Sequence, residues 1–392
     1  MNSPKVRFKY FTEDWKIIKL NSLMSFNNGI NAEKDSYGHG RKFINVLDIL
    51  NNNFVKYNDI IGSVSVSEKV EKTNKVEYGD LLFLRSSETR EDVGKSSVYL
   101  DEDESALFGG FVIRGKKQAD YHPYFLKLNL ESPEVRNQIS SKAGGSTRFN
   151  ISQSILSSIE ISIPSQNEQE RIAEFISHFD KKIQLQQEKT ELLKEQKKGY
   201  MQNIFNQKLR FNSNSPEWTY SNLGDISLIE KGNQLNKDSL SKLNDNKNPF
   251  PVYNGGVSPS GYTNKFNRQK DNIIISEGGN SCGYVNFINQ PFFSGGHSYT
   301  INILNETSID KYYLYSYLKY MQKRIMDLRV GSGLPNIQKT ALTKFQVLIP
   351  HINEQKRISE FLTVFDKKIK LEMKKLDSLV YQKQAFMQQM FI

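Results

Sequence analysis

The sequence contains almost no cysteine and no long apolar segment. Cys282 is the single cysteine among 392 residues, so neither an intramolecular disulfide nor a cysteine-based zinc site is possible within this chain. No run of eighteen apolar residues occurs, and a transmembrane helix is therefore not expected. The opening residues, MNSPKVRFKYFTEDW, lack the apolar core of a signal peptide. Together these absences predict a cytoplasmic protein with no membrane partner.

Complete catalytic motifs are also missing. The five histidines show no metal-ligand spacing. Gly94-Lys95-Ser96 resembles the end of a P-loop, but Thr89 stands where that motif requires glycine. The tetrapeptide NPFP at 248–251 has the residues of an amino-methyltransferase motif in a different order, and no glycine-rich cofactor loop precedes it. We therefore expect no catalytic residue and no metal site, and we expect Cys282 to be a small buried apolar residue.

The charge balance favours a polyanionic partner without establishing one. Lysine and arginine number 53 against 43 aspartates and glutamates, which gives a net charge of +10 and a pI near 9.2. Such a surplus is typical of proteins that contact nucleic-acid phosphates. A solvated surface explains it equally well, so charge alone leaves the partner open.

The most informative feature is an internal repeat. The stretch NEQERIAEFISHFDKKI at 167–183 returns as NEQKRISEFLTVFDKKI at 353–369, with twelve of seventeen positions identical and an offset of 186 residues. The same offset relates Gly109-Gly110 to Gly295-Gly296, whereas Gly29 matches Gly232 at an offset of 203. The chain thus consists of two copies of one plan, each with a variable opening part and a closely matched closing part.

The closing parts are expected to be long helices. Asn167 and Asn353 are suitable N-caps, and no proline interrupts 167–206. A helix over 168–205 would span about 57 Å at 1.5 Å per residue. Apolar residues recur at alternating spacings of four and three, which is typical of a coiled-coil seam, with polar interruptions at Lys197, Glu372 and Lys383. Each helix could instead pack only on its own domain, and Gly199 could bend the first one.

Connectivity indicates the relative direction of the two helices. Only about a dozen residues, including NSNSP at 212–216, join the first helix to the second variable part, which leads directly into the second helix. If that part is compact, the second helix begins where the first ends. We therefore expect an antiparallel pair with pseudo-twofold symmetry and one variable domain at each end.

The variable parts are interpreted as β-rich mixed domains. Short apolar runs at 79–85 and 271–279 predict strands, and the segments 121–130 and 310–325 predict helices. The expected fold is α+β: two β-rich mixed domains separated by a long antiparallel two-helix coiled coil.

Basic, aromatic and amide side chains gather in loops of both domains. Arginine and lysine can bind phosphates or guanine, and asparagine suits adenine. Any one of these side chains could equally be exposed without a function. The candidate DNA-binding residues are Arg85, Arg90, Lys95 and Arg148 in the first domain, and Tyr253, Asn254, Tyr262, Lys265, Arg268 and Lys270 in the second.

Two variable domains alternating with helices entered through IPSQNEQERIAEFI and IPHINEQKRISEFL make the pattern recognisable. Over nearly its whole length the chain resembles the specificity subunit of type I restriction-modification enzymes. The resemblance implies target recognition domains at 1–163 and 210–349, and repeated spacer and docking helices at 164–209 and 350–392. Each domain would read one half of a bipartite, asymmetric sequence in double-stranded DNA.

The resemblance also implies partners and cofactors. Two adenine-N6 methyltransferase subunits would dock on the helices, and restriction subunits would join them in a bacterial or archaeal cytoplasm. S-adenosylmethionine, ATP and Mg²⁺ would be bound by those partners and none by this chain. The residues that match the repeated motif are candidates for partner docking or for orienting each helix: Pro164, Asn167, Glu168, Gln169, Arg171, Pro350, Asn353, Glu354, Gln355 and Arg357.

Two other functions stay open at this stage. A coiled-coil scaffold with protein-binding end domains predicts weak, salt-insensitive contact with DNA. A self-contained methyltransferase predicts direct binding of S-adenosylmethionine, against which the missing cofactor loop argues.

Overall fold

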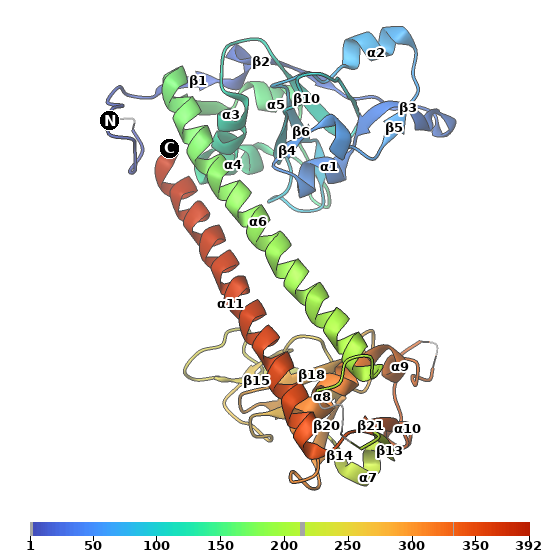
Figure 1. Cartoon of the computed structure of the whole chain (residues 1–392). Coiled ribbons are helices and arrows are strands. Elements are labelled where there is room, and N and C mark those ends of the chain that lie inside the picture. The colour runs from blue at the N-terminus through green and yellow to red at the C-terminus, as the bar shows by residue number, and fades with distance from the viewer. Residues whose placement is uncertain (1–2, 212–215, 332) are drawn as a thin grey trace. The chain divides into compact units, whose positions relative to one another are not determined.

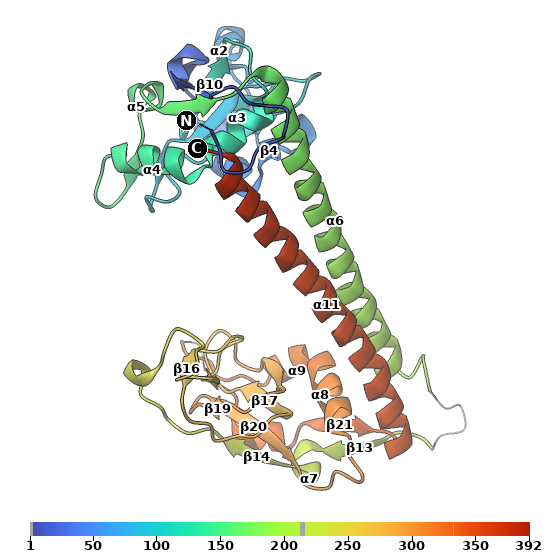
Figure 2. The ribbon, with the colours of Figure 1, turned by 90° about the vertical axis from the view of Figure 1, so that its left-hand side faces the viewer.

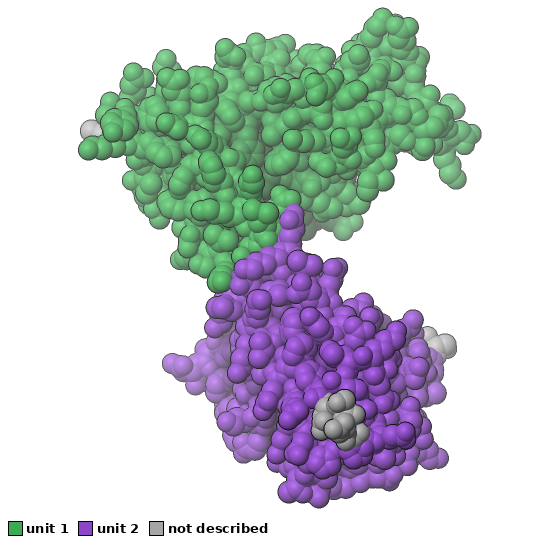
Figure 3. All heavy atoms as spheres, in the orientation of Figure 1, with its two compact units in different colours: residues 1–186, 375–392 green, residues 187–374 purple. Residues whose placement is uncertain are grey.

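The computed structural model describes residues 3–211, 216–331 and 333–392. Most of the predicted linker, 212–215, and Ser332 lie outside the described residues. The chain divides into two compact units (Figure 3). Unit 1 comprises residues 1–186 and 375–392, and unit 2 comprises 187–374. Each unit therefore contains one variable domain and part of each long helix.

Unit 1 is built on a five-stranded sheet of order β2-β10-β6-β8-β4, on which helix α3 packs through β8 (Figure 1). All four residues of β6 are buried, as the apolar run at 79–85 predicted. The strands are β1 (Lys16–Lys19), β2 (Met24–Asn28), β3 (Tyr37–Ile44), β4 (Phe54–Val55), β5 (Ser63–Val64), β6 (Leu81–Leu84), β7 (Ser86–Ser87), β8 (Ser96–Tyr99), β9 (Leu107–Phe108), β10 (Val112–Lys117), β11 (Phe149–Asn150) and β12 (Glu160–Ile163). The helices are α1 (Val46–Asn51), α2 (Glu68–Asn74), α3 (Pro123–Leu130), α4 (Pro133–Lys142) and α5 (Gln153–Ser157), with short 3-10 turns η1 (Leu20–Ser22), η2 (Lys34–Ser36) and η3 (Tyr57–Asp59).

Unit 2 repeats this plan with a four-stranded sheet of order β14-β20-β17-β18, and α8 packs on β17 and β18 (Figure 2). The predicted strand within 271–279 is β17, and Cys282 is buried as expected, with 1% of its surface exposed. The strands are β13 (Thr219–Asn222), β14 (Ser227–Lys231), β15 (Phe250–Tyr253), β16 (Gly261–Thr263), β17 (Asn272–Ser276), β18 (Val285–Ile288), β19 (Phe293–Ser294), β20 (Ser298–Ile303) and β21 (Gln346–Ile349). The helices are α7 (Leu223–Ile226), α8 (Lys311–Tyr320), α9 (Gln322–Met326) and α10 (Lys339–Thr343), with a 3-10 turn η4 (Lys237–Ser239).

In both units the first and last strands of the domain pair with each other. Strand β1 runs antiparallel to β12, with Lys16 opposite Ile163, and β13 runs antiparallel to β21, with Thr219 opposite Ile349. The chain therefore enters and leaves each domain along one two-stranded ribbon. The last strand passes through a buried proline directly into the long helix, which places the helix entry against the domain.

The predicted long helices are confirmed as α6 (Gln166–Phe205) and α11 (Ile352–Met390). Helix α6 continues through Gly199 as one element. The prediction that Asn167 and Asn353 are N-caps is wrong, because both lie inside the first turn. The carbonyl oxygen of Ser165 accepts from the amides of residues 168 and 169, and that of His351 accepts from those of residues 354 and 355. The caps therefore lie two residues earlier in the sequence.

Each unit's core contains segments of both long helices. In unit 1, Ile172 and Ile176 of α6 belong to the same buried cluster as Met390 and Phe391 near the end of the chain. In unit 2, Ile358 and Leu362 of α11 belong to one cluster with the last turns of α6. Each domain thus buries the start of its own helix and the end of the other. Among the described residues, no helix is long and apolar enough to cross a membrane.

Candidate nucleic-acid interface

The repeated helix entry of unit 1 contains a buried ion pair. The carboxylate of Glu168, which is 1% exposed, accepts from Arg7 through Nε at 2.7 Å and Nη2 at 2.8 Å. These hydrogen bonds raise the pKa of the Arg7 guanidinium above its ordinary value. Because Arg7 lies in the first residues of the chain, this bidentate contact holds the N-terminal segment against α6.

The neighbouring glutamine connects α6 to two further parts of the same domain. Gln169 donates from Nε2 to the carbonyl of Pro164 at 3.0 Å, and its Oε1 accepts from the backbone amide of His122 at 3.0 Å. His122 is the N-cap of α3, and its Nδ1 accepts from the amide of Phe125 at 3.2 Å. One amide side chain thus connects the end of β12, the start of α3 and the first turn of α6.

Unit 2 repeats both contacts. Glu354 accepts from Arg210 through Nε at 2.7 Å and Nη2 at 2.9 Å, and from Nε1 of Trp218 at 3.2 Å. Gln355 donates to the carbonyl of Pro350 at 2.9 Å, and its Oε1 accepts from the amide of Asp310 at 2.8 Å. The glutamate and the glutamine of the NEQ motif therefore join each domain to its own helix through corresponding contacts.

The structure separates the ten predicted junction residues into two groups. The side chains of Glu168, Gln169, Glu354 and Gln355, together with Pro164 and Pro350, are buried within their own units, so these residues orient the helix and do not offer a surface. Asn167, Arg171, Asn353 and Arg357 are exposed on the first two turns of the two helices. Of the ten residues, this second group alone is exposed to solvent.

A second repeated cluster connects each domain to both helices. In unit 1, Asp180 of α6 accepts from Lys383 of α11 at 2.6 Å and from the hydroxyl of Tyr124 on α3. In unit 2, the corresponding cluster consists of Asp366, Lys197 and Tyr312. The aspartates and the lysines are each 186 residues apart. The polar interruptions of the predicted seam at Lys197 and Lys383 are thus the cationic members of these clusters.

Further pairs show how the helix segments run within unit 2. Lys189 pairs with Glu372 at 3.1 Å, Lys197 with Asp366 at 2.6 Å, and the Tyr200 ring contacts the Phe361 ring at 5.2 Å. Residue numbers rise along α6 as they fall along α11, so the two segments are antiparallel in this unit. In unit 1, Phe175 and Phe179 of α6 both contact Phe386 of α11.

Three of the four DNA-binding candidates in the first domain lie around one small strand pair. Strand β7 pairs with β11; Arg85 directly precedes β7, Arg90 follows it by three residues, and Arg148 directly precedes β11. The Arg90 guanidinium lies 4.8 Å from the centre of the Phe149 ring, and Arg85 is half-buried and donates to the carbonyl of Gly110. Arg148 is exposed.

Lys95 is the fourth candidate of the first domain, and it is only partly available. It is exposed but forms an ion pair with Asp92 at 2.5 Å, and that contact lowers the pKa of the Asp92 carboxyl. One of the three N–H donors of Lys95 is thus directed to Asp92, and the others are left for a ligand.

The candidates of the second domain are less alike in their surroundings. Lys265 and Lys270 are exposed, and Tyr262 is half-buried in β16. Asn254 uses its Oδ1 to accept from the amide of His297 at 3.1 Å. Tyr253 packs against the ring of Phe292, and burial raises the pKa of its hydroxyl.

Arg268 is the weakest of the DNA-binding candidates. Its donors are directed to Thr300 Oγ1 at 3.3 Å and to the carbonyl of Asn267 at 2.8 Å, and Nη2 lies 3.6 Å from Glu230. Because these contacts within the domain already occupy the donors of the Arg268 guanidinium, fewer donors remain for a DNA base.

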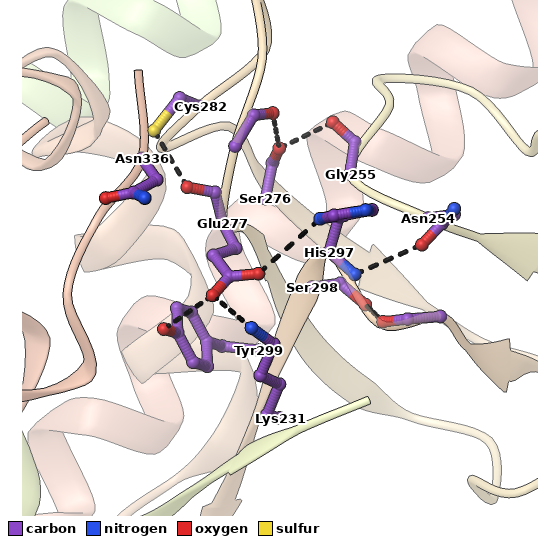
Figure 4. A network of polar contacts seen from close by, with 12 residues as sticks. Lys231, Asn254, Gly255, Ser276, Glu277, Cys282, His297, Ser298, Tyr299 and Asn336 are labelled. Atoms are coloured by element: carbon purple, nitrogen blue, oxygen red, sulfur yellow. Dashed lines mark hydrogen bonds and ion pairs between the residues drawn. The ribbon is translucent and has the colours of Figure 1, made fainter. Parts of the chain in front are cut away.

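Sequence reasoning missed a polar network centred on Glu277 (Figure 4). The Oε1 atom accepts from Lys231 at 2.5 Å and from the hydroxyl of Tyr299 at 3.1 Å, and Oε2 lies 3.8 Å from Nδ1 of His297. The sequence did contain a signal for His297, because this residue directly follows Gly295-Gly296, the second copy of the repeated glycine pair. Over the described residues no group of three or more His, Cys, Asp or Glu could hold a metal ion.

Two domains of one fold, joined to long helices by the same buried contacts and differing in their loop side chains, define a duplicated binding protein. The chain belongs to the family described as the type I restriction modification DNA specificity domain, whose model matches residues 12–195 and 216–380. The resemblance predicted from the paired helix entries is therefore confirmed.

Individual relatives agree with this assignment. The chain is 37% identical over 163 residues to a type I specificity subunit of Mycoplasma pneumoniae and 34% identical over 163 residues to one of Mycoplasma genitalium. These alignments cover 41% of this chain in both cases and only 42% and 41% of the two relatives. A type I restriction enzyme specificity subunit of Methanocaldococcus jannaschii is 25% identical, over 98% of this chain and 95% of that protein.

Solved structures share the fold. The crystal structure of the S subunit of a type I restriction-modification system from M. genitalium has a TM-score of 0.65 at 20% identity and covers 100% of this chain and 99% of that one. A chain from a structure on complex assembly and conformational transition of the type I system has a TM-score of 0.57 at 15% identity, covering 95% and 96%. At these identities the likeness concerns the fold alone.

Proposed function

We propose that this chain is the non-catalytic DNA-recognition subunit of a type I restriction-modification complex. Each variable domain reads one half of a bipartite, asymmetric target in double-stranded DNA. The observation that carries the proposal is the contrast between the two copies. Their buried junctions share the arginine–glutamate pair and both glutamine contacts, whereas the loop side chains at matched positions differ. Identical junctions suit identical partners, and different loops suit different half-sites.

The partners follow from the same reasoning. Two adenine-N6 methyltransferase subunits dock on the helices, and the exposed first two turns with Arg171 and Arg357 are the part of the repeated motif available to them. Restriction subunits join that core. S-adenosylmethionine, ATP and Mg²⁺ are bound by these partners, and the complex works in the cytoplasm. That α6 and α11 form one antiparallel coiled coil spacing the two half-sites is part of this proposal.

Methylation mapping directly tests whether the chain determines the DNA sequence that the complex recognises. The chain is co-expressed with its matching methyltransferase subunit in a host that lacks DNA methylation, and N6-methyladenine is then mapped across the host genome. The expected result is one split motif, with two short specified halves around a fixed unspecified gap. Absence of methylation by an assembled complex, with a methyltransferase active alongside another specificity subunit, contradicts the proposal.

The scaffold alternative makes a different prediction about salt. A DNA-reading complex loses affinity steeply as salt rises, because each neutralised phosphate releases counterions. A scaffold with protein-binding end domains binds duplex DNA weakly, with little salt dependence. Binding of the assembled complex to duplex DNA at about 50 mM and 200 mM salt separates these outcomes, with roughly a thousandfold loss expected for six or more phosphate contacts.

A further inference from the structure

Arg85 and Glu277 occupy the same backbone position in the two domains. The amide of Arg85 donates to the carbonyl of Phe111 at 2.9 Å, and its own carbonyl accepts from the amide of Ile151 at 3.0 Å. The amide of Glu277 donates to the carbonyl of His297 at 2.9 Å, and its carbonyl accepts from the amide of Ile337 at 2.8 Å. Phe111 and His297 are 186 residues apart, as are Ile151 and Ile337. One position of the shared fold therefore has a cation in one domain and an anion in the other.

The residue whose carbonyl accepts from this position also differs between the domains, being Phe111 in the first and His297 in the second, and it is exposed to solvent in both. Phe111 is 60% exposed, and the side chain of His297 is 59% exposed. His297 lines a cavity of about 540 Å³ together with Asn254 and Gln234. In the first domain Arg85 lines a different cavity, of about 620 Å³, together with Asn150 and Ile151. A ligand can therefore reach His297 in the second domain and Arg85 in the first.

The surroundings of Glu277 hold its carboxylate in place. Lys231 and Tyr299 both donate to Oε1, and only 12% of the Glu277 side chain is exposed (Figure 4). The free oxygen, Oε2, faces Nδ1 of His297. A carboxylate beside one ring nitrogen favours the tautomer with the proton on that nitrogen. The other ring nitrogen, Nε2, is then a hydrogen-bond acceptor on an exposed side chain.

We propose that His297 reads a base through Nε2 and that Glu277 is the residue that positions its ring. Since a neutral Nε2 accepts, the base must present a donor in the major groove, which is the exocyclic amino group of adenine or cytosine. In the first domain the position of Glu277 is occupied by Arg85, whose donors fit the two acceptors of guanine. The inference rests on the proposed function and assigns opposite hydrogen-bonding requirements to the two half-sites.

The test uses the full chain with its methyltransferase and the same genome-wide methylation map. Wild type is expected to show guanine at one position of the first half-site, and adenine or cytosine at one position of the second. His297→Ala is expected to relax that second position alone, and His297→Arg is expected to change it to guanine. Glu277→Gln is expected to reduce discrimination there roughly fivefold, a smaller effect than loss of a full bidentate contact.

A matched control is available at the other end of strand β20. Glu306 is an exposed glutamate of the same unit, with 69% of its side chain exposed, and Glu306→Gln is expected to leave both half-sites unchanged. The His297 variants alter an exposed side chain, so they stay informative if Glu277→Gln impairs folding. An unchanged second half-site in both His297 variants overturns the inference. So does loss of all methylation by an assembled His297→Ala complex, since loss of one base contact relaxes one position. A wild-type complex that methylates nothing counts against the proposed function instead.

Discussion

Removing the arginine of one junction should destabilise one unit and spare the other. In Arg210→Met the carboxylate of Glu354, which is 0% exposed, loses both guanidinium hydrogen bonds and keeps only the Trp218 donor. Breaking a buried pair by removing one partner typically costs about 3–5 kcal/mol. Arg210 is 23% exposed, so we take the low end, about 3 kcal/mol. That is roughly a 150-fold increase in the opening equilibrium of unit 2, at 1.4 kcal/mol per factor of ten.

Hydrogen exchange measured by mass spectrometry provides the assay, because it reports each unit separately within one chain. Peptides from β17, β20 and α8 should lose protection by about that factor, while peptides from β6 and β10 of unit 1 serve as an internal reference. Arg324→Met is a matched control, since Arg324 is an exposed arginine of the same unit. The double variant Arg210→Met with Glu354→Gln should recover part of the loss, because no buried charge is then left without its partner.

Either of two results would contradict this role of the Arg210–Glu354 pair. Protection in unit 2 that changes less than about threefold in Arg210→Met would mean that the buried pair contributes no more than an exposed one. An equal loss of protection in both units would mean that the contact does not act within its own unit.

Three further perturbations follow from single contacts. Gly199→Ala should stabilise α6 by about 0.5–1 kcal/mol, visible as a higher melting temperature, because an added Cβ meets nothing within 4 Å; a lower melting temperature would contradict this. Burial lowers the pKa of His122 below its ordinary value of 6.5. Below pH 6.5 the unfolded chain therefore binds a proton at this histidine more readily than the folded chain does, and the stability of the fold decreases as the pH falls. His122→Asn keeps a cap acceptor and should lose less stability than wild type between pH 7.5 and 5.5 in urea unfolding; equal losses would exclude this role. Lys383→Met removes the cation of the Asp180 cluster in unit 1 and should cost roughly 2 kcal/mol, with hydrogen exchange rising only in that unit.

The repeated helices could be predicted from the sequence because their signals are local. Spacing of apolar residues and absence of proline define α6 over 166–205 to within two residues at its start. The cap was misplaced at Asn167 because α6 already begins at Gln166, and the carbonyl of Ser165 accepts from the amides of residues 168 and 169. Residue preferences describe only frequencies at helix ends, and helix boundaries commonly shift by one or two residues.

The partners of the buried glutamates could not be predicted, because they lie far away in the chain. Arg7 and Glu168 are 161 residues apart, and Arg210 and Glu354 are 144 apart. Nothing in the surrounding residues marks Arg7 among the basic residues of its segment. The same difficulty affected Arg268, which looked free in a basic loop but is engaged with Thr300 across the sheet. Composition identifies which side chains can bind a ligand, and only the strand pairing decides which are already occupied.

Glycines at matched positions of the two copies, Gly29 and Gly232, explain why the loop side chains can differ while the fold stays the same. A Cβ on Gly29 would lie 2.2 Å from the carbonyl oxygen of Gly109, and one on Gly232 would lie 2.2 Å from that of Gly295. Real Cβ atoms do not make contacts that short, so no side chain fits at either place. The residue after β2 or β14 can therefore approach the turn before β10 or β20 only if it is glycine.

This backbone contact positions the residues beside it without using their side chains. Ile30 bridges to Gly109 and Asn233 to Gly295 through the main chain. Phe111 and His297 therefore reach the same place in the two domains whatever their chemistry. A fold that determines loop position through glycine and main-chain hydrogen bonds leaves the exposed side chains free to change. Two domains of the same fold can in this way present different hydrogen-bonding groups at matched positions.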